Sequence, residues 1–198
     1  MSLDLDGFLS PEILGYIEDN KRTYASWFAL IYAVNKIAQS RLLSLKVDGA
    51  DMRGIYAAGL YGRGLTNFQG AILLAERCHQ SGARTLLRNC FEDIFYLGAV
   101  QSAEDYYEKF VRADEVGRGR LARALLNRPE SRDHLDPAHI ELLEEFLAKT
   151  GSDDRKASPI NVAQAARDAG LDRIYDIYLS RLVQRVFSRI RDLAVAAY

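Results

Sequence analysis

The sequence has few prolines, few cysteines and almost no net charge. Only four prolines occur in 198 residues, so long stretches can form helices without the interruption that proline causes. The formal net charge is −1, which gives no general attraction toward nucleic acid or an acidic membrane. Binding of either kind would need a local patch of charge.

The two cysteines do not predict a disulfide. Cys78 and Cys90 both fall in apolar helical patterns. They lie at unequal distances from Ser81-Gly82, where we predict a tight turn, so an antiparallel hairpin would not place their Cβ atoms together. We interpret both as reduced core thiols, which favours a cytoplasmic protein. No histidine pairs with either cysteine at metal-ligand spacing, so we predict neither a metal site nor a cofactor.

Long apolar runs are also missing. The longest uncharged run, residues 23–35, is shorter than the roughly 20 residues that a membrane-spanning helix needs. The acidic N-terminus lacks the basic region of a signal peptide. We therefore expect no membrane partner. The sequence ends in AVAAY, which is still helical in character, so whether the natural C-terminus is included stays open.

Apolar residues recur at spacings of three and four along almost the whole chain, which predicts an all-α fold. We expect a single domain over residues 1–198, a bundle of six or seven helices built around a central antiparallel hairpin. Mobile loops are expected at about 127–136 and 150–158. The predicted helices cover residues 10–46, 55–79, 83–101, 103–127, 137–149, 159–170 and 172 onward.

The central hairpin, about residues 55–101, carries most of the polar residues that border an apolar stripe. With one acidic residue of the next helix, these are the candidate ligand-binding residues: Arg63, Asn67, Arg84, Arg88, Glu92 and Asp114. Arg88 and Glu92 are four residues apart and can pair directly. Asp114 is expected to meet Arg84 or Arg88 across a helix interface.

Two interpretations of this polar seam stay open. Two arginines beside carboxylates can bind a phosphate or carboxylate group, which predicts a small-anion site. The alternative is a partly buried ion-pair network that fixes the register of the helices. We interpret the neighbouring Glu92 and Asp93 as ordinary surface charges.

No complete catalytic set is present, and we predict no catalytic residue. Serine and histidine do not come close in any motif, and Cys78 and His79 point in different directions on a helix. The predicted last helix has an arginine at every fourth position: Arg181, Arg185 and Arg189. Such a basic stripe could bind nucleic acid. The alternative is a helix face exposed to solvent.

The hairpin resembles an uncharacterised bacterial family of all-helical proteins of unknown function. The likeness extends over about residues 60–126, and its signature is an A-R-x-L-x-R-x-x-x-E pattern. Here that pattern is Ala83-Arg84, Leu86, Arg88 and Glu92. Family members often carry a histidine four residues after the serine of Tyr178-Leu179-Ser180, where this chain has Gln184. The resemblance implies the helical fold and points to these residues without implying an activity.

A more distant likeness is to HEPN ribonuclease domains, which are helical and often belong to toxin–antitoxin or defence systems. Their motif is an arginine, often followed by asparagine, with a histidine four to six residues later. Arg88 and Asn89 match its start, but Asp93 stands at a histidine position. A ribonuclease needs that histidine for proton transfer or for holding the phosphate.

Three functional hypotheses follow. The leading one is a non-catalytic cytoplasmic binding or interaction protein, with a small anion or a protein as its partner. The alternative is a divergent HEPN-like ribonuclease or a toxin- or defence-associated protein. The third is a homo-oligomeric scaffold joined through the long first helix. Near-heptad apolar residues suit that helix to pack lengthwise on others: Trp27, Ile31, Val34, Ala38, Leu42 and Leu45.

Overall fold

The computed structural model describes residues 6–103, 105–150 and 160–177, and in these residues all regular structure is helical. This confirms the predicted all-α class. The loop predicted at 150–158 and most of the predicted last helix lie outside the described residues. The single-domain organisation stays a prediction.

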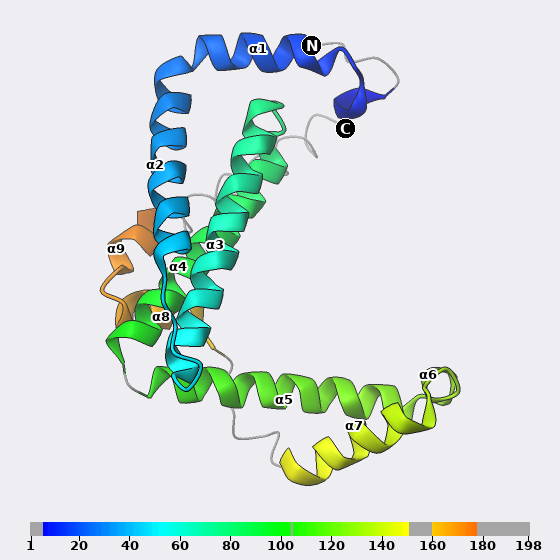
Figure 1. Ribbon diagram of the computed structural model, residues 1–198. Helices are drawn as coiled ribbons and strands as arrows, with labels where there is room; N and C mark the ends of the chain where they lie inside the picture. The colour runs from blue at the N-terminus through cyan, green and yellow to red at the C-terminus, as the bar shows by residue number, and fades with distance from the viewer. Residues whose placement is uncertain (1–5, 104, 151–159, 178–198) are drawn as a thin grey trace, which may run out of the picture.

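The predicted hairpin is confirmed and forms the centre of the fold. It consists of α3 (Met52–Glu76) and α4 (Gln80–Ser102), which run antiparallel and pack along their length (Figure 1). Phe95 and Val100 of α4 are fully buried. They pack with residues of α3, α5 and α8 in the main core cluster, so the hairpin supplies both the scaffold and much of the apolar interior.

The turn of the hairpin lies at Arg77–His79, not at the predicted Ser81-Gly82. Cys78 adopts a left-handed conformation with φ 59°, and His79 begins α4 by accepting a hydrogen bond at Nδ1 from the Gly82 amide, at 3.1 Å. A Cβ at Gly82 would lie 2.6 Å from that nitrogen. The glycine therefore permits a close helix cap inside the first turn and does not mark the turn itself.

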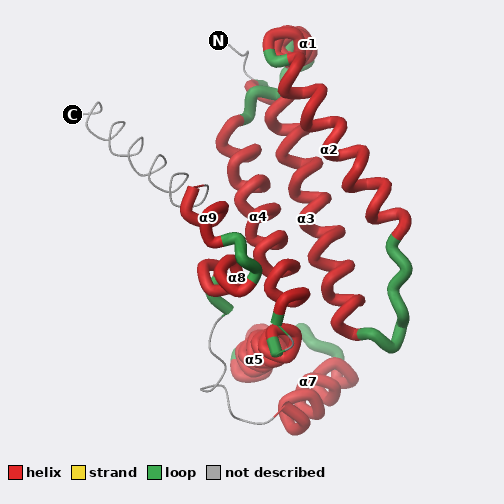
Figure 2. Tube along the Cα trace, turned by 90° about the vertical axis from the view of Figure 1, so that its left-hand side faces the viewer, coloured by secondary structure: helices red, strands yellow, loops and turns green. Residues whose placement is uncertain are grey.

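The long first helix predicted over residues 10–46 is broken into two. A short 3-10 helix, η1 (Gly7–Leu9), precedes α1 (Ile13–Thr23), and the chain bends at Tyr24 before α2 (Ala25–Ser44). α1 lies across the end of the hairpin and α2 runs beside α3 (Figures 1 and 2). The bend is needed because a straight helix could not pack beside α3 and also cross its end.

The chain after the hairpin forms an arm at the opposite end of the bundle. α5 (Tyr106–Asn127) leaves the base of α4 and packs against α7 (Pro137–Thr150) (Figure 1). The segment predicted as a loop at 127–136 contains a one-turn helix, α6 (Pro129–Arg132), which has proline in its first turn. Proline suits this position because its missing N–H would have no partner there.

A last pair of short helices covers the other side of α4. α8 (Val162–Asp168) buries Ala165 and Ala166 against α4, and α9 (Asp172–Tyr175) follows it. A Cβ at Gly98 of α4 would lie 2.6 Å from the Cβ of Ala169, so glycine allows this close contact. The described residues thus form nine α-helices. These are more than the six or seven predicted, because the first predicted helix breaks at Tyr24 and because the one-turn helix α6 was not predicted.

Candidate binding groove

A buried carboxylate lies at the centre of the hairpin. Asp93 of α4 is 4% exposed. One of its oxygens, Oδ1, accepts a hydrogen bond from Nε of Arg63 at 2.7 Å and forms an ion pair with Nη2 of the same arginine at 2.5 Å. Its other oxygen, Oδ2, accepts from the Asn67 amide at 2.9 Å. A buried charge is tolerated when it is paired and hydrogen-bonded in this way.

The interpretation of Asp93 as a surface charge is therefore wrong. Asp93 lies on the face of α4 that turns toward α3, where Gly64 provides room for it. A Cβ at Gly64 would come within 3.3 Å of the Asp93 Cβ. Arg63 and Asn67, which lie one turn apart on α3, reach the carboxylate from either side of that glycine. We call Arg63, Asn67 and Asp93 the polar node.

The structure does not gather the six predicted ligand residues into one cluster. Arg63 and Asn67 meet at the polar node. Arg88 and Glu92 form the expected pair, with Nε and Oε1 at 2.9 Å, but the arginine side chain is 53% exposed. Arg84 lies half-buried one turn earlier on α4, and no hydrogen bond or ion pair joins it to the described residues. Whether these residues bind an anion stays a prediction.

Asp114 does not meet Arg84 or Arg88. Its Oδ2 lies 2.6 Å from Nη2 of Arg118, one turn further along α5. α5 leaves the bundle at the C-terminal end of α4 (Figure 1). Arg88 lies 14 residues before that end at Ser102, which is about 21 Å along a helix. The sequence alone did not show the direction in which α5 leaves α4.

An apolar groove lies between α2, α3 and α4, with a cavity volume of about 270 Å³. Its wall includes Asp93 of the polar node. Val34 and Ile94 line the groove and are exposed, so it opens to the surface. Leu65, Phe68, Leu87 and Phe91 also line the groove.

Cys90 also lines this groove, but its thiol is unsuited to act as a nucleophile. Burial first, and the charge of Asp93 second, raise the pKa of Cys90 to about 11. The reactive form of cysteine is the thiolate, and this pKa keeps the group protonated near neutral pH. Both oxygens of Asp93 are already engaged by the other members of the polar node. The groove therefore offers an apolar binding surface without an activated group.

A second apolar surface runs along the outer face of α2. Its members are 46% to 65% exposed: Trp27, Leu30, Val34 and Ile37. We call these four residues the α2 stripe. The expectation that this helix packs lengthwise on its neighbours holds for one side only, since Ile31 and Ala38 are half-buried. Val34 belongs to both surfaces, so the groove and the α2 stripe are continuous. Large exposed apolar patches commonly mark interaction sites.

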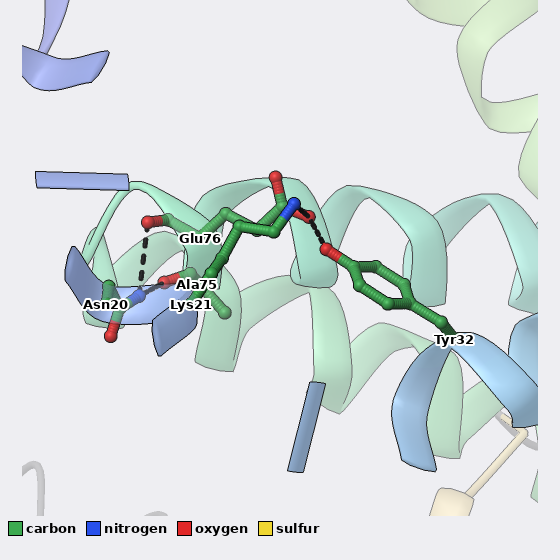
Figure 3. A network of polar contacts seen from close by, with 5 residues as sticks. All are labelled: Asn20, Lys21, Tyr32, Ala75 and Glu76. Carbon is green, nitrogen blue, oxygen red and sulfur yellow. Dashed lines mark hydrogen bonds and ion pairs between the residues drawn. The ribbon is translucent and has the colours of Figure 1, made fainter. Parts of the chain in front are cut away.

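A polar network fixes α1 and α2 to the end of α3 (Figure 3). The Asn20 amide donates to the carbonyls of Ala75 and Glu76, at 2.8 and 3.1 Å. The Tyr32 hydroxyl donates to the Glu76 carboxylate, and Lys21 Nζ lies 3.6 Å from the same carboxylate oxygen. These partners are distant in sequence, so no local pattern predicts the network.

Lys21 and Tyr32 of this network keep their protons. The hydrogen bond with Tyr32 and, after it, the charge of Glu76 raise the pKa of Lys21. Partial burial and then the hydrogen bond to Glu76 raise the pKa of Tyr32. A protonated lysine and a protonated tyrosine suit a structural clamp. Neither is the deprotonated form that a general base requires.

Among residues 6–103, 105–150 and 160–177, no group of three or more histidine, cysteine, aspartate or glutamate side chains is placed to hold a metal ion. No helix in this part of the chain has the length and apolar character required to cross a bilayer.

One comparison with known proteins gives a match. A family model described as "Family of unknown function (DUF5677)" matches residues 54–184, which begin in α3 and include the polar node. No curated protein and no solved structure matches the chain. The match thus covers the hairpin and the arm, and it supplies no activity.

Proposed function

We propose a binding function for this chain, which belongs to the DUF5677 family of unknown function. In this proposal the protein is non-catalytic and associates through the α2 stripe with a second copy of itself. The observation that supports it is the exposure of Trp27 and Ile37, each 65%, on a helix that buries only Phe28. Water-exposed side chains of this size become favourable contacts once they are covered.

The spacing of the α2 stripe suits pairing with its own copy. Its four members follow one another at intervals of three, four and three residues, the spacing of a coiled-coil seam. α2 has 20 residues and is about 30 Å long. If two copies are related by a two-fold axis beside α2, the α2 stripe of one copy contacts the α2 stripe of the other.

The charge pattern of α2 also supports a second copy of this chain as the partner. Lys36 is the single charged residue between Ala25 and Ser40. A pair of identical helices therefore brings few like charges together. Flanking charges are the usual means of selecting a different partner at such a seam, and α2 has none beside the stripe.

We place this function in the cytoplasm. Cys78 and Cys90 are both free thiols, and free thiols with no disulfide suit a reducing compartment. A HEPN-like ribonuclease is not favoured. Asp93 stands where that motif needs a histidine, and its carboxylate is held by the polar node.

The test is sedimentation across a range of protein concentrations, with tryptophan emission measured in parallel. Trp27 is the one tryptophan of the chain, so its emission reports on the stripe directly. We expect a dimer at micromolar concentration and a red shift of emission on dilution. Ile37→Asp should give a monomer, and the control Lys36→Asp, on the neighbouring position outside the stripe, should still form dimers. A wild-type monomer at high concentration, or a dimer that survives Ile37→Asp, would contradict the proposal.

A further inference from the structure

The groove and the α2 stripe form one continuous apolar surface, because Val34 belongs to both. Val34 and Ala38 form the edge of the groove that α2 supplies. The Tyr61 hydroxyl donates to the Ala38 carbonyl at 2.9 Å, which fixes this edge to α3. A second copy that covers the stripe therefore lies beside the open groove. Which of its side chains reaches the groove depends on the direction in which its α2 runs.

Only two arrangements of a two-fold pair let every member of the α2 stripe contact another member. The intervals of three, four and three residues read the same in both directions. In a parallel pair, each residue meets its own copy. In an antiparallel pair centred at position 32, Trp27 meets Ile37 and Leu30 meets Val34. The two-fold axis repeats these contacts in both copies.

The position of Arg41 favours the antiparallel arrangement. Arg41 lies seven residues after Val34, so it continues the line of the stripe. A parallel pair would place the two Arg41 side chains next to each other, and such a contact between like charges is unfavourable. The antiparallel pair brings Arg41 to the bend between α1 and α2 instead, where the Tyr24 side chain is 55% exposed. A guanidinium group is attracted to the face of a tyrosine ring.

The position of the groove favours the same direction. In a parallel pair, Trp27 of the second copy lies eleven residues before the level of Ala38, which is about 16 Å along the helix. In the antiparallel pair it lies level with Ile37, one residue from Ala38 at the groove edge. The largest side chain of the stripe therefore reaches the groove only when the two helices run in opposite directions.

The groove has room for an indole ring. Its volume is about 270 Å³, and an apolar protein cavity of about 150 Å³ already accommodates benzene. Leu65, Leu87 and Phe91 give the groove an apolar lining. The Trp27 side chain is 65% exposed, so most of its surface is available for a contact with a second copy. Covering an aromatic side chain of this size makes a large contribution to association.

We propose that two copies pair with antiparallel α2 helices and that Trp27 of each copy enters the groove of the other. This inference rests on the proposed pairing through the α2 stripe and adds its direction, its register and the occupant of the groove. The interface then includes α3 and α4 as well as α2.

Disulfide trapping tests the direction and the register. Full-length Trp27→Cys and Ile37→Cys are made in a Cys78→Ser, Cys90→Ala background that sedimentation shows to be dimeric. They are oxidised separately and as an equal mixture, and the products are separated by non-reducing electrophoresis. A disulfide requires Cβ atoms close together. We expect a cross-linked dimer from the mixture, in which the second contact between Trp27 and Ile37 is unchanged.

Either variant alone should give little cross-linked dimer. Identical positions of the stripe ends lie ten residues apart in the antiparallel pair, which is about 15 Å along the helices. Efficient cross-linking of Ile37→Cys alone would show parallel helices and overturn the inference, while pairing through α2 would stand. A dimer that gives no disulfide in any sample would show another register and overturn it too. A wild-type monomer at high concentration would remove the pairing itself and this arrangement with it.

A second measurement tests whether Trp27 enters the groove. Ile94 lines the groove from α4 and is 41% exposed, so Ile94→Asn changes the groove wall at its surface. This substitution should raise the dissociation constant of the dimer about tenfold. The control Leu73→Asn, at an α3 residue that is 61% exposed and lies outside the groove lining, should leave the dissociation constant unchanged. Equal constants for the wild type and Ile94→Asn would place Trp27 outside the groove and overturn the proposed contact.

Discussion

Replacing Arg63 with methionine should destabilise the protein much more than the same replacement at Arg88. Methionine keeps most of the aliphatic stem and removes the charge and the hydrogen bonds. In Arg63→Met the carboxylate of Asp93, 4% exposed, keeps Asn67 as its partner at the polar node and loses its counter-charge. Arg88→Met breaks a pair with Glu92 in which the arginine is 53% exposed.

The magnitudes follow from burial. Removing one partner of a buried ion pair costs about 3–5 kcal/mol, because the other charge stays buried. Arg63 is itself 61% exposed, so solvent already weakens its attraction and the low end applies, about 3 kcal/mol. Asp93→Asn leaves no buried charge and should cost about 1.5 kcal/mol. Because the pair of Arg88 and Glu92 is exposed, Arg88→Met should lower the free energy of unfolding by about 0.5 kcal/mol or less.

The assay is urea unfolding followed by far-ultraviolet circular dichroism, carried out as a double-mutant cycle. Arg63→Met combined with Asp93→Asn should be less destabilising than the sum of the two, with a coupling energy of about 2 kcal/mol. Additive effects would show that the two side chains do not depend on each other. A loss for Arg88→Met as large as that for Arg63→Met would refute the reasoning from burial.

Three further predictions concern α4 and its surroundings. Gly98→Ala should lower the free energy of unfolding by about 2 kcal/mol, because its methyl would clash with the chain that follows α8. Gly59→Ala has open space around it and should raise that free energy by about 1 kcal/mol. Chemical unfolding measures both values. Burial raises the pKa of Cys90 from 9.0 to about 11, so the folded state holds this proton more tightly, and the resulting stabilisation is present below pH 9 and lost as the pH rises from 9 to 11. Alkylation should accordingly modify the partly exposed Cys78 well before Cys90 near neutral pH, and comparable rates would contradict that pKa. The predicted anion site is tested by the melting temperature in inorganic phosphate, which should rise in the wild type and not in Arg84→Gln; equal shifts would remove the site.

The helical class and the central hairpin could be predicted because periodicity is a local property. Apolar residues at spacings of three and four fix which segments are helical and which face turns inward. The position of Asp93 could have been predicted in the same way, since it lies seven residues after Leu86 and three after Cys90, on the apolar side of α4. Its charge led to its interpretation as a surface residue.

Other features had no local signal. Tyr24 breaks a helix in a stretch without proline or glycine, because α1 must cross the end of α3. Cys78 takes the left-handed conformation that glycine usually occupies, while the glycine four residues later serves a close cap. Asp114 could not be placed, since the direction of α5 depends on packing that spacing does not reveal.

In both helices of the hairpin, the last backbone carbonyls accept hydrogen bonds from side chains that lie outside that helix. The last carbonyls of α3 accept from Asn20 of α1, and the carbonyls of Val100 and Gln101 on α4 accept from Arg53 at 2.8 Å each. Helix ends usually fray on their own, because their last carbonyls have no partner within the helix. Here the final turn of α3 should open to hydrogen exchange when α1 detaches, and that of α4 when the start of α3 unwinds. Each of these two ends thus unfolds together with the helix that supplies its hydrogen-bond donor.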